Sequence, residues 1–462
     1  MHLRKTEFRT PGIAGVLALL VLAPACTATT TESESTAVTG TAYEGARVIV
    51  GDGRVIENAT FVVDDGRFVA VGAAGEVEVA ADATRVDLTG MTVMPTIVDA
   101  HTHLSTTRAE LVDDLERRAY HGVGAALSLG HDPEGAPLEV RGELIAGAAR
   151  YGSAGRGITM PEPGRSEAPH WVTTEEEARQ AVRDEAARDV DIIKIWVDDR
   201  NGQYEKLSPE LYAAVIDEAH QQGLQVTAHI FALEDAKGLL RAGIDAFAHG
   251  VRDQDVDDEL VELVRERPDV VLVPNLPGRG VPTDLSWLAG SMPAEELAEM
   301  QARATENPAA QERFAVQARN LARLNEAGMR IALGTDGNTP WAPHVEMEDM
   351  VAAGMTPAQV LVAATSNAAE LVGMAEIGTV EPGKSADFVV LQANPLEDIT
   401  NTRRIAAVYL RGEELDRQAM TTSPSITRNV AAFPSPGSTL GLVSPVPVAP
   451  RSARLPLRQP RR

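Results

Sequence analysis

Four histidines and one aspartate stand at the ends of short apolar segments of this 462-residue chain. They are His101 and His103 in D-A-H-T-H, His229 in T-A-H, His249 in F-A-H-G and Asp336 in L-G-T-D. In parallel α/β barrels the chemistry belongs to the carboxyl ends of the strands, where alternate residues point the same way. Imidazole nitrogens and carboxylate oxygens are ligands that zinc prefers. A hydrogen bond at the barrel rim would explain any one of them, but the set predicts a metal centre.

A lysine interrupts the most apolar of these segments, D-I-I-K-I-W-V. Such a near-continuous apolar run is typical of a parallel strand that is covered on both faces. An unpaired ammonium group is costly to bury. Lys194 is therefore either a plain lysine paired with Asp336 or Asp198, or a group that is no longer a cation.

The elements that must position these residues follow two patterns. Residues 94–375 alternate apolar strands with helical stretches such as T-T-E-E-E-A-R-Q-A-V and S-P-E-L-Y-A-A-V, which predicts an α/β protein with an eight-stranded (β/α)8 barrel. Its third strand is expected in G-I-T-M. Residues 43–93 and 376–418 carry β-like runs separated by G-D-G and D-D-G turns, and we expect them to build one small β-sandwich from both ends of the chain. Residues 253–308 are either a lid or scaffold.

The motifs V-M-P-T-I-V-D-A-H-T-H-L, I-I-K-I, T-A-H-I, F-A-H-G, L-G-T-D and G-T-V-E-P-G-K-S-A-D-F-V-V-L resemble those of the amidohydrolase superfamily. The likeness is closer to its imidazolonepropionase-like and prolidase-like (Xaa-Pro dipeptidase) secreted branch, and it runs from about Tyr43 to Leu415. It implies a TIM barrel with a composite β-sandwich and two divalent ions, zinc by expectation.

The resemblance also implies a ligand set. His101, His103 and Asp336 would hold one ion, and His229 and His249 the other. Lys194, carboxylated by CO2 at its side-chain nitrogen, would bridge the two, since burial favours the neutral amine that can add CO2.

In that scheme a hydroxide bridging both ions cleaves an amide or peptide bond, and Asp336 is the catalytic general acid and base. Expected substrates are an Xaa-Pro or other dipeptide, or an N-acyl amino acid. The same site could open a lactone or a phosphotriester. A different class, an inactive solute-binding lipoprotein on the same barrel, is disfavoured because every expected ligand is present.

Candidate substrate contacts lie in the loops around these strands. Tyr204 follows the lysine strand, His170 lies in G-R-S-E-A-P-H-W, and Arg252 comes three residues after His249, where it could pair with a substrate carboxylate. Phe231 replaces the second histidine of the frequent H-A-H motif, which predicts a bulkier or more apolar substrate. For His170, Tyr204 and Arg252 an ordinary surface or supporting role is an equal alternative. A second departure from the family pattern is Thr96, where P-G is usual.

The first 25 residues predict export, because a basic start leads into G-I-A-G-V-L-A-L-L-V-L-A, an apolar run of signal-peptide length. The following A-P-A-C resembles a lipobox, so Cys26 would be lipidated and anchor a cell-envelope lipoprotein; ordinary cleavage at the same bond would give a periplasmic or secreted protein. As the only cysteine, Cys26 permits no internal disulfide.

The two ends of the chain and its net charge carry further predictions. Residues 26–42 are Thr/Ser-rich and predict a disordered tether, and residues 419–462 predict a disordered Pro/Arg-rich tail. The net charge of −25, from 67 acidic and 42 basic residues, argues against nucleic acid and against a membrane contact other than the lipid anchor. The expected partner is a small-molecule substrate. Homo-oligomer formation is left open.

Overall fold

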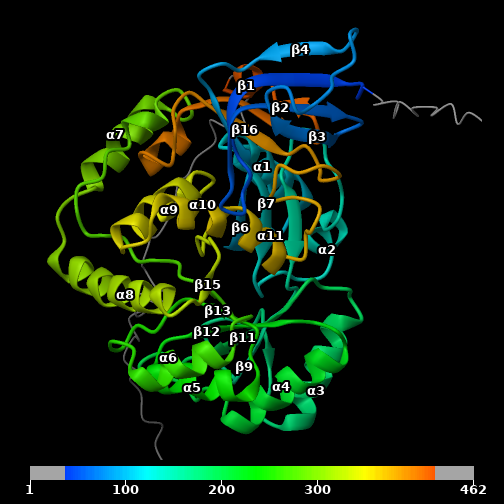
Figure 1. The fold of residues 1–462 in the computed structure, drawn as a ribbon. Coiled ribbons are helices and arrows are strands. Elements are labelled where there is room, and N and C mark those ends of the chain that lie inside the picture. The colour runs from blue at the N-terminus through cyan, green and yellow to red at the C-terminus, as the bar shows by residue number, and fades with distance from the viewer. Residues whose placement is uncertain (1–36, 422–462) are drawn as a thin grey trace, which may run out of the picture. The chain divides into compact units, whose positions relative to one another are not determined.

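The computed structural model describes residues 37–421 (Figure 1). The predicted signal peptide, Cys26, most of the tether and residues 422–462 of the predicted tail lie outside these residues. Within the described range, no helix is both long enough and apolar enough to cross a bilayer.

Strands from both ends of the chain form one mixed eight-stranded sheet, as the blue and orange arrows of Figure 1 show. Its order is β18-β17-β16-β5-β1-β2-β3, with β4 paired to β1. The strands are β1 (Thr41–Ile49), β2 (Val55–Asp64), β3 (Arg67–Ala73), β4 (Thr84–Asp87), β5 (Thr92–Pro95), β16 (Phe388–Leu391), β17 (Ile405–Leu410) and β18 (Glu413–Glu414). Buried aromatic rings join the two ends: Tyr43 and Phe61 each pack edge-on against Phe388, with ring centroids 5.4 Å apart in both pairs.

The expected composite domain is confirmed as a joint product of both ends, but its hydrogen bonding differs from that of a two-sheet sandwich. Strand β5 pairs in parallel with β1 and antiparallel with β16. Because β5 uses both of its edges, it connects the early and late strands into a single sheet.

The parallel strands form two further sheets. One has the order β6-β7-β8, and the other has the order β10-β9-β11-β12-β13-β14-β15. These strands are β6 (Ile97–Thr102), β7 (Val123–Ser128), β8 (Arg150–Ser153), β9 (Ile158–Thr159), β10 (His170–Trp171), β11 (Ile193–Val197), β12 (Val226–Ile230), β13 (Ala246–Ala248), β14 (Val271–Val273) and β15 (Arg330–Ile331).

The prediction of a closed barrel is wrong, because the parallel strands form two separate sheets and no continuous β-ladder runs around the whole ring. At one seam β15 has only two residues, and Leu333 N then donates to Ala363 O rather than to a strand. Single bonds still cross there, from Ala100 N to Leu333 O at 2.9 Å. At the other seam, Asp191 N donates to Ser153 O at 3.0 Å. The carboxyl ends of the strands on both sides thus remain linked.

The third parallel strand also lies elsewhere than predicted. Strand β8, which pairs with β7, is Arg150–Ser153, whereas the expected G-I-T-M contributes only the two residues of β9. Arg150 is buried in β8 and bonds to Asp387 Oδ2 at 3.1 Å. Its charge hides the strand from a search for apolar runs, because the compensating carboxylate is far away in the sequence.

Helices cover the parallel strands and begin where the sequence signals predict. Thr174 and Glu177 form a complete capping box on α3, and Ser208 caps α4 ahead of Pro209. The helices are α1 (Arg108–Tyr120), α2 (Ala136–Val140), α3 (Glu175–Ala186), α4 (Pro209–Gln221), α5 (Leu233–Ala242), α6 (Asp258–Glu266), α7 (Ala294–Arg303), α8 (Pro308–Glu326), α9 (Ala342–Ala352), α10 (Pro357–Ala364), α11 (Ser366–Leu371) and α12 (Arg417–Thr421), with 3₁₀ turns η1 (Ser286–Leu288) and η2 (Ile399–Arg403).

Residues 253–308 contain two kinds of helix. Helix α6 packs Leu260 and Val264 into the main hydrophobic core, so this part is scaffold. Helix α7 buries none of its residues.

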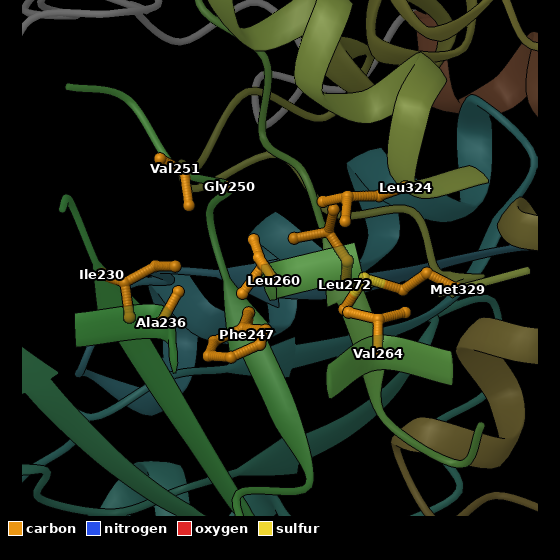
Figure 2. Close-up of a pocket in the computed structure, with 10 residues that line it drawn as sticks. All are labelled: Ile230, Ala236, Phe247, Gly250, Val251, Leu260, Val264, Leu272, Leu324 and Met329. Carbon is orange, nitrogen blue, oxygen red and sulfur yellow. The ribbon is translucent and has the colours of Figure 1, made fainter. Parts of the chain in front are cut away.

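A small cavity lies behind strands β12 to β14 and is lined by apolar side chains and Gly250 (Figure 2). It offers no polar group that could orient a substrate or hold an ion, so it is a packing defect of the core. The polar groups that could do chemistry lie on the other face of the same strands.

Candidate metal centre

The parallel strands bring five of the six predicted ligands to their carboxyl ends and place the sixth, Lys194, in the barrel interior below them. His101 lies in β6, His229 lies in β12, and His249 directly follows β13. His103 follows β6, and Asp336 follows the segment after β15. His101, His229 and His249 are each at most 8% exposed. Burial of this many polar rings requires partners inside the protein.

Asp336 is the hub of the cluster. Its Oδ1 lies 3.1 Å from His101 Nε2 and 3.0 Å from His103 Nε2, and its Oδ2 lies 3.5 Å from His249 Nε2. One ligand atom from each of His101, His249 and Asp336 lies within 4.8 Å of the others. These three residues could hold a metal ion.

The backbone at the hub is held in an uncommon conformation. Asp336 has a φ of 55° and His249 a φ of 80°, both in the left-handed region that non-glycine residues rarely adopt. The Asp336 amide donates to His101 O at 2.8 Å, which fixes the turn against the neighbouring strand. Strain of this kind persists only where surrounding contacts over-determine it, and it gathers at functional sites.

The protonation states suit a metal. Burial lowers the pKa of His101 to about 4, and it places the pKa of both His229 and His249 well below the ordinary value. Burial works to raise the pKa of Asp336, but the nearby His101 and His249 outweigh it, so that this pKa lies well below its usual range. At neutral pH the site thus presents neutral imidazoles and a carboxylate, the forms that bind metals.

Lys194 points to the inside of the parallel strands. Its neighbours Ile193 and Ile195 belong to the cluster packed against the helices, whereas Ile192 belongs to the inner cluster. Alternation then places Lys194 and Trp196 on the inner side, and the lysine Nζ lies 5.6 Å from the Trp196 ring centroid. Lys194 is only 1% exposed.

The ammonium nitrogen has no compensating partner. Among residues 37–421, nothing hydrogen-bonds to the buried Nζ, and no carboxylate oxygen forms an ion pair with it within 4.0 Å. The alternative of a plain lysine paired with Asp336 or Asp198 is therefore not what the structure holds. Burial lowers the pKa of Lys194 to about 7, although the negative charge of Asp336 acts in the opposite direction.

His229 lies beside the three-residue cluster rather than in it. Its ring centroid is 4.7 Å from that of His249. Its Nε2 lies 2.9 Å from Asp198 Oδ2 and 3.1 Å from Arg200 Nη1. The structure thus brings all six predicted ligands into one region, with His229 bonded to a neighbouring ion pair.

Asn275 was missed by the sequence analysis although it contacts a predicted ligand. It follows β14, and its Oδ1 lies 2.9 Å from His101 Nδ1. Its φ is 45°, and both oxygens of Glu346 lie within 3.2 Å of the next amide, Leu276 N. An Oδ1 acceptor keeps the proton on Nδ1 of His101 and leaves Nε2 free to face Asp336. The sequence feature that could have identified Asn275 is its position just after an apolar strand.

His131 was also missed, and it lies just after the carboxyl end of β7 (Val123–Ser128). Its Nδ1 lies 3.3 Å from His103 Nδ1, and its ring centroid is 5.1 Å from that of Trp196. Burial lowers the pKa of His131 to about 3. The S-L-G-H sequence at a strand end was the signal that could have identified it.

The four predicted substrate contacts separate into two pairs. Arg252 Nη2 lies 3.5 Å from His229 Nε2, and its guanidinium lies 5.7 Å from the Phe231 ring centroid. His170 instead bonds through Nε2 to the buried Glu185 at 2.6 Å, and Tyr204 donates its hydroxyl to Pro163 O at 3.2 Å. Arg252 and Phe231 are therefore placed beside a predicted ligand, whereas His170 and Tyr204 bind other parts of the loops.

Comparison with known proteins agrees with this geometry. Residues 92–415 match the amidohydrolase family. The chain belongs to this family. A Bifidobacterium longum chain assigned as a prolidase superimposes with a TM-score of 0.67 at 30% identity, over 82% of this chain and 95% of that one. Ochratoxinase of Aspergillus niger is 26% identical over 81% of this chain and 85% of its own length. Imidazolonepropionase of Geobacillus thermodenitrificans is 26% identical over 74% and 86%.

Family membership confirms the resemblance seen in the motifs. The protein is an amidohydrolase-family enzyme, a hydrolase that acts on carbon–nitrogen bonds. The cluster of His101, His249 and Asp336 is the part of the structure that could hold its metal.

Proposed function

We propose that this protein is an exported hydrolase that cleaves the amide or peptide bond of a small substrate, an Xaa-Pro or other dipeptide or an N-acyl amino acid, with the help of two divalent ions, zinc by expectation. The observation that carries the proposal is Lys194, a buried amine without a partner beside a cluster of neutral imidazoles and one carboxylate. The likeness to a chain assigned as a prolidase supports the choice of bond.

In this proposal the six residues hold two ions. His101, His103 and Asp336 would hold the first, and His229 and His249 the second. Lys194 would add CO2 at Nζ, forming a nitrogen–carbon bond and releasing a proton, and the resulting carbamate would reach both ions. A neutral amine is required for that addition, and the pKa of about 7 caused by burial provides it at neutral pH. A carbamate would also give the buried Nζ group the partners that it lacks.

The chain's own residues would perform the proton transfers. Divalent ions, when bound, lower the pKa of water and polarise a carbonyl. The Asp336 carboxylate, ionised at neutral pH because its pKa is low, would take up the proton that the attacking water loses. It would then return that proton to the leaving nitrogen. A hydrogen bond from His103 Nε2 to its Oδ1 would orient this carboxylate.

Metal analysis of matched variants tests this function. We expect about two ions per chain in the wild type, with hydrolysis of members of a dipeptide and N-acyl amino acid panel. Lys194→Ala should lose metal and most activity, and it should also lose the carbamate carbon signal that ¹³C-labelled bicarbonate gives in NMR spectra. Lys206→Ala is the control, because Lys206 pairs with Asp235 at 2.7 Å on the partly exposed side of the fold. Full activity of Lys194→Ala would exclude the bridging role.

The same panel decides between the alternatives. Lactones and phosphotriesters belong in it, because the same site could open either. A chain that binds metal and solutes but turns over no member of the panel would be a binding protein rather than an enzyme.

Export and anchoring rest on residues 1–26 alone. We propose that the chain is cleaved before Cys26 and that Cys26 is lipidated, which would hold the enzyme on a membrane of the cell envelope. Mass spectrometry of the mature N-terminus tests this, with Cys26→Ala expected to move the protein from the membrane fraction to the soluble fraction. An unmodified N-terminal Cys26 would support ordinary secretion instead.

A further inference from the structure

Arg252 is a cation beside the metal centre that forms no direct ion pair with any described residue, although the charges of Asp336 and Asp198 act on it from farther away. Its Nη2 donates to Ile230 O at 2.9 Å, and its buried Nε has no hydrogen-bond partner within residues 37–421. No carboxylate oxygen in that range lies within 4.0 Å of its guanidinium nitrogens. A guanidinium keeps its charge in proteins, so its burial without an anion is costly.

The neighbouring Arg200 shows what a compensated arginine looks like at this place. It bonds to Asp198 Oδ2 at 2.7 Å and to Glu162 Oε1 at 3.0 Å. Its Nη1 lies 3.1 Å from His229 Nε2, the same nitrogen that Arg252 approaches. Arg200 thus engages Asp198 and Glu162, and the histidines engage Asp336. No carboxylate is left in contact with Arg252, so the anion of a ligand could pair with it directly.

Phe231 indicates the chemical nature of a ligand that would pair with Arg252. It follows β12, is 36% exposed and is among the few large apolar side chains at the surface of the described residues. The Arg252 guanidinium lies 5.7 Å from its ring centroid. An unpaired guanidinium beside an exposed aromatic ring matches a ligand that carries a carboxylate next to an apolar group.

We propose that Arg252 binds the substrate carboxylate and that Phe231 contacts the apolar side chain next to it, so that the enzyme selects amides whose leaving group is an apolar amino acid with a free carboxylate. This inference rests on the proposed amide hydrolysis. In a dipeptide or an N-acyl amino acid, that carboxylate is one carbon away from the scissile nitrogen. The subsite therefore excludes capped peptides and neutral amides from the preferred substrates.

Hydrolysis of a matched pair tests the subsite in the metal-loaded full chain. The pair is N-acetyl-L-phenylalanine and its carboxamide, followed by release of the free α-amine. We expect the wild type to prefer the free acid, and Arg252→Gln to lower kcat/KM for the acid by on the order of 10- to 100-fold while hardly changing that for the carboxamide. Arg252→Lys should restore part of the preference because it restores the charge.

A matched control separates this effect from general damage. Arg267 is another partly buried arginine that donates to backbone carbonyls, at Leu240 and Ile244, and it lies away from the site. Arg267→Gln should leave the ratio of acid to carboxamide unchanged, whatever it does to stability. If Arg252→Gln lowers both substrates equally and loses metal, Arg252 supports the ligands and the proposal is wrong.

Binding of the product tests the subsite without catalysis. Calorimetry should show that L-phenylalanine binds the metal-loaded wild type more tightly than L-phenylalaninamide, and that Arg252→Gln removes the difference. A chain that hydrolyses no amide but shows this difference would overturn the proposed function and keep the subsite. A chain that hydrolyses both members of the acetylated pair equally well would keep the function and overturn the subsite.

Discussion

Two lysines are almost completely buried in this fold, and their surroundings are opposite. Lys194 on β11 is 1% exposed, and its Nζ has no partner among the described residues. Lys237 on α5 is 3% exposed, and its Nζ lies within 2.9 Å of carboxylates of Glu234, Asp257 and Glu259. Burial lowers the pKa of Lys194 to about 7, whereas hydrogen bonds to Asp257 and Glu234 raise the pKa of Lys237.

The contrast shows that the partners of a buried cation indicate its role. Where the fold supplies carboxylates, the cation stabilises the fold: Lys237 pairs with Asp257, which ties α5 to the start of α6. Where the fold withholds them, as at Lys194 and Arg252, the cost of burial is offset elsewhere and the group is available for ligands.

Replacing each lysine by methionine, in separate variants, should give the largest effects on activity and thermal stability. Lys194→Met should lower activity by on the order of 100-fold or more, since a ligand is removed, while the metal-free protein keeps or gains thermal stability because an unpaired buried amine is replaced by an apolar chain. Lys237→Met should do the reverse, with unchanged activity and a lower Tm. The measurements are steady-state kinetics and thermal melts with and without chelator.

A loss of thermal stability in metal-free Lys194→Met would contradict the absence of a partner for Lys194. If metal-free Lys194→Met melts well below the wild type, Lys194 has structural partners that its surroundings do not reveal.

Asn275 offers the next largest effect, through His101. Asn275→Ala removes the acceptor at His101 Nδ1, and loss of such an outer contact typically costs about 10- to 100-fold in metal affinity. Competition with a chromogenic chelator measures it. Asn58→Ala is the control, because Asn58 also has a positive φ, 47°, but is exposed on strand β2. Equal losses in both variants would assign the effect to backbone strain instead.

The pH dependence of stability gives a smaller but cleaner signal. The folded-state pKa of Lys194, about 7, lies below the ordinary value of 10.5, so between these values the unfolded chain binds more protons at this residue. The contribution of Lys194 to stability therefore rises as pH increases from about 7 to about 10, and it is lost as pH falls through 7. Melts of metal-free, CO2-free protein should show the wild type gaining on Lys194→Met across this window. A constant difference between the two would contradict the lowered pKa.

The sequence predicted the cluster of His101, His249 and Asp336 because its signal is local: a histidine or an aspartate at the end of an apolar run. His131 carries the same signal and could have been included. Asn275 could be only suspected, because nothing in its own segment indicates that His101, far away in the sequence, lies 2.9 Å from its side chain.

The strands were also predicted from local signals. Apolar strands were recognised in the sequence, but β8 was not, because it contains Arg150, whose partner Asp387 comes from the other end of the chain. The number of strands likewise does not determine closure of the ring. That depends on which acceptor Leu333 N finds, and it finds Ala363 O. Pairings between distant segments decide both cases, and a pattern within one segment does not contain them.

The smallest expected effect comes from an ordinary ion pair at Lys206. Its Nζ lies 2.7 Å from Asp235 Oδ2, but the lysine side chain is 35% exposed, so water and salt screen the pair. Lys206→Ala should therefore change the free energy of unfolding by less than about 1 kcal/mol and leave both activity and metal content as in the wild type. Chemical denaturation measures the first and the assays above the others. A larger loss would mean that partial exposure does not weaken pairing here, and then the stabilising role given to Lys237 would not require its three carboxylate partners.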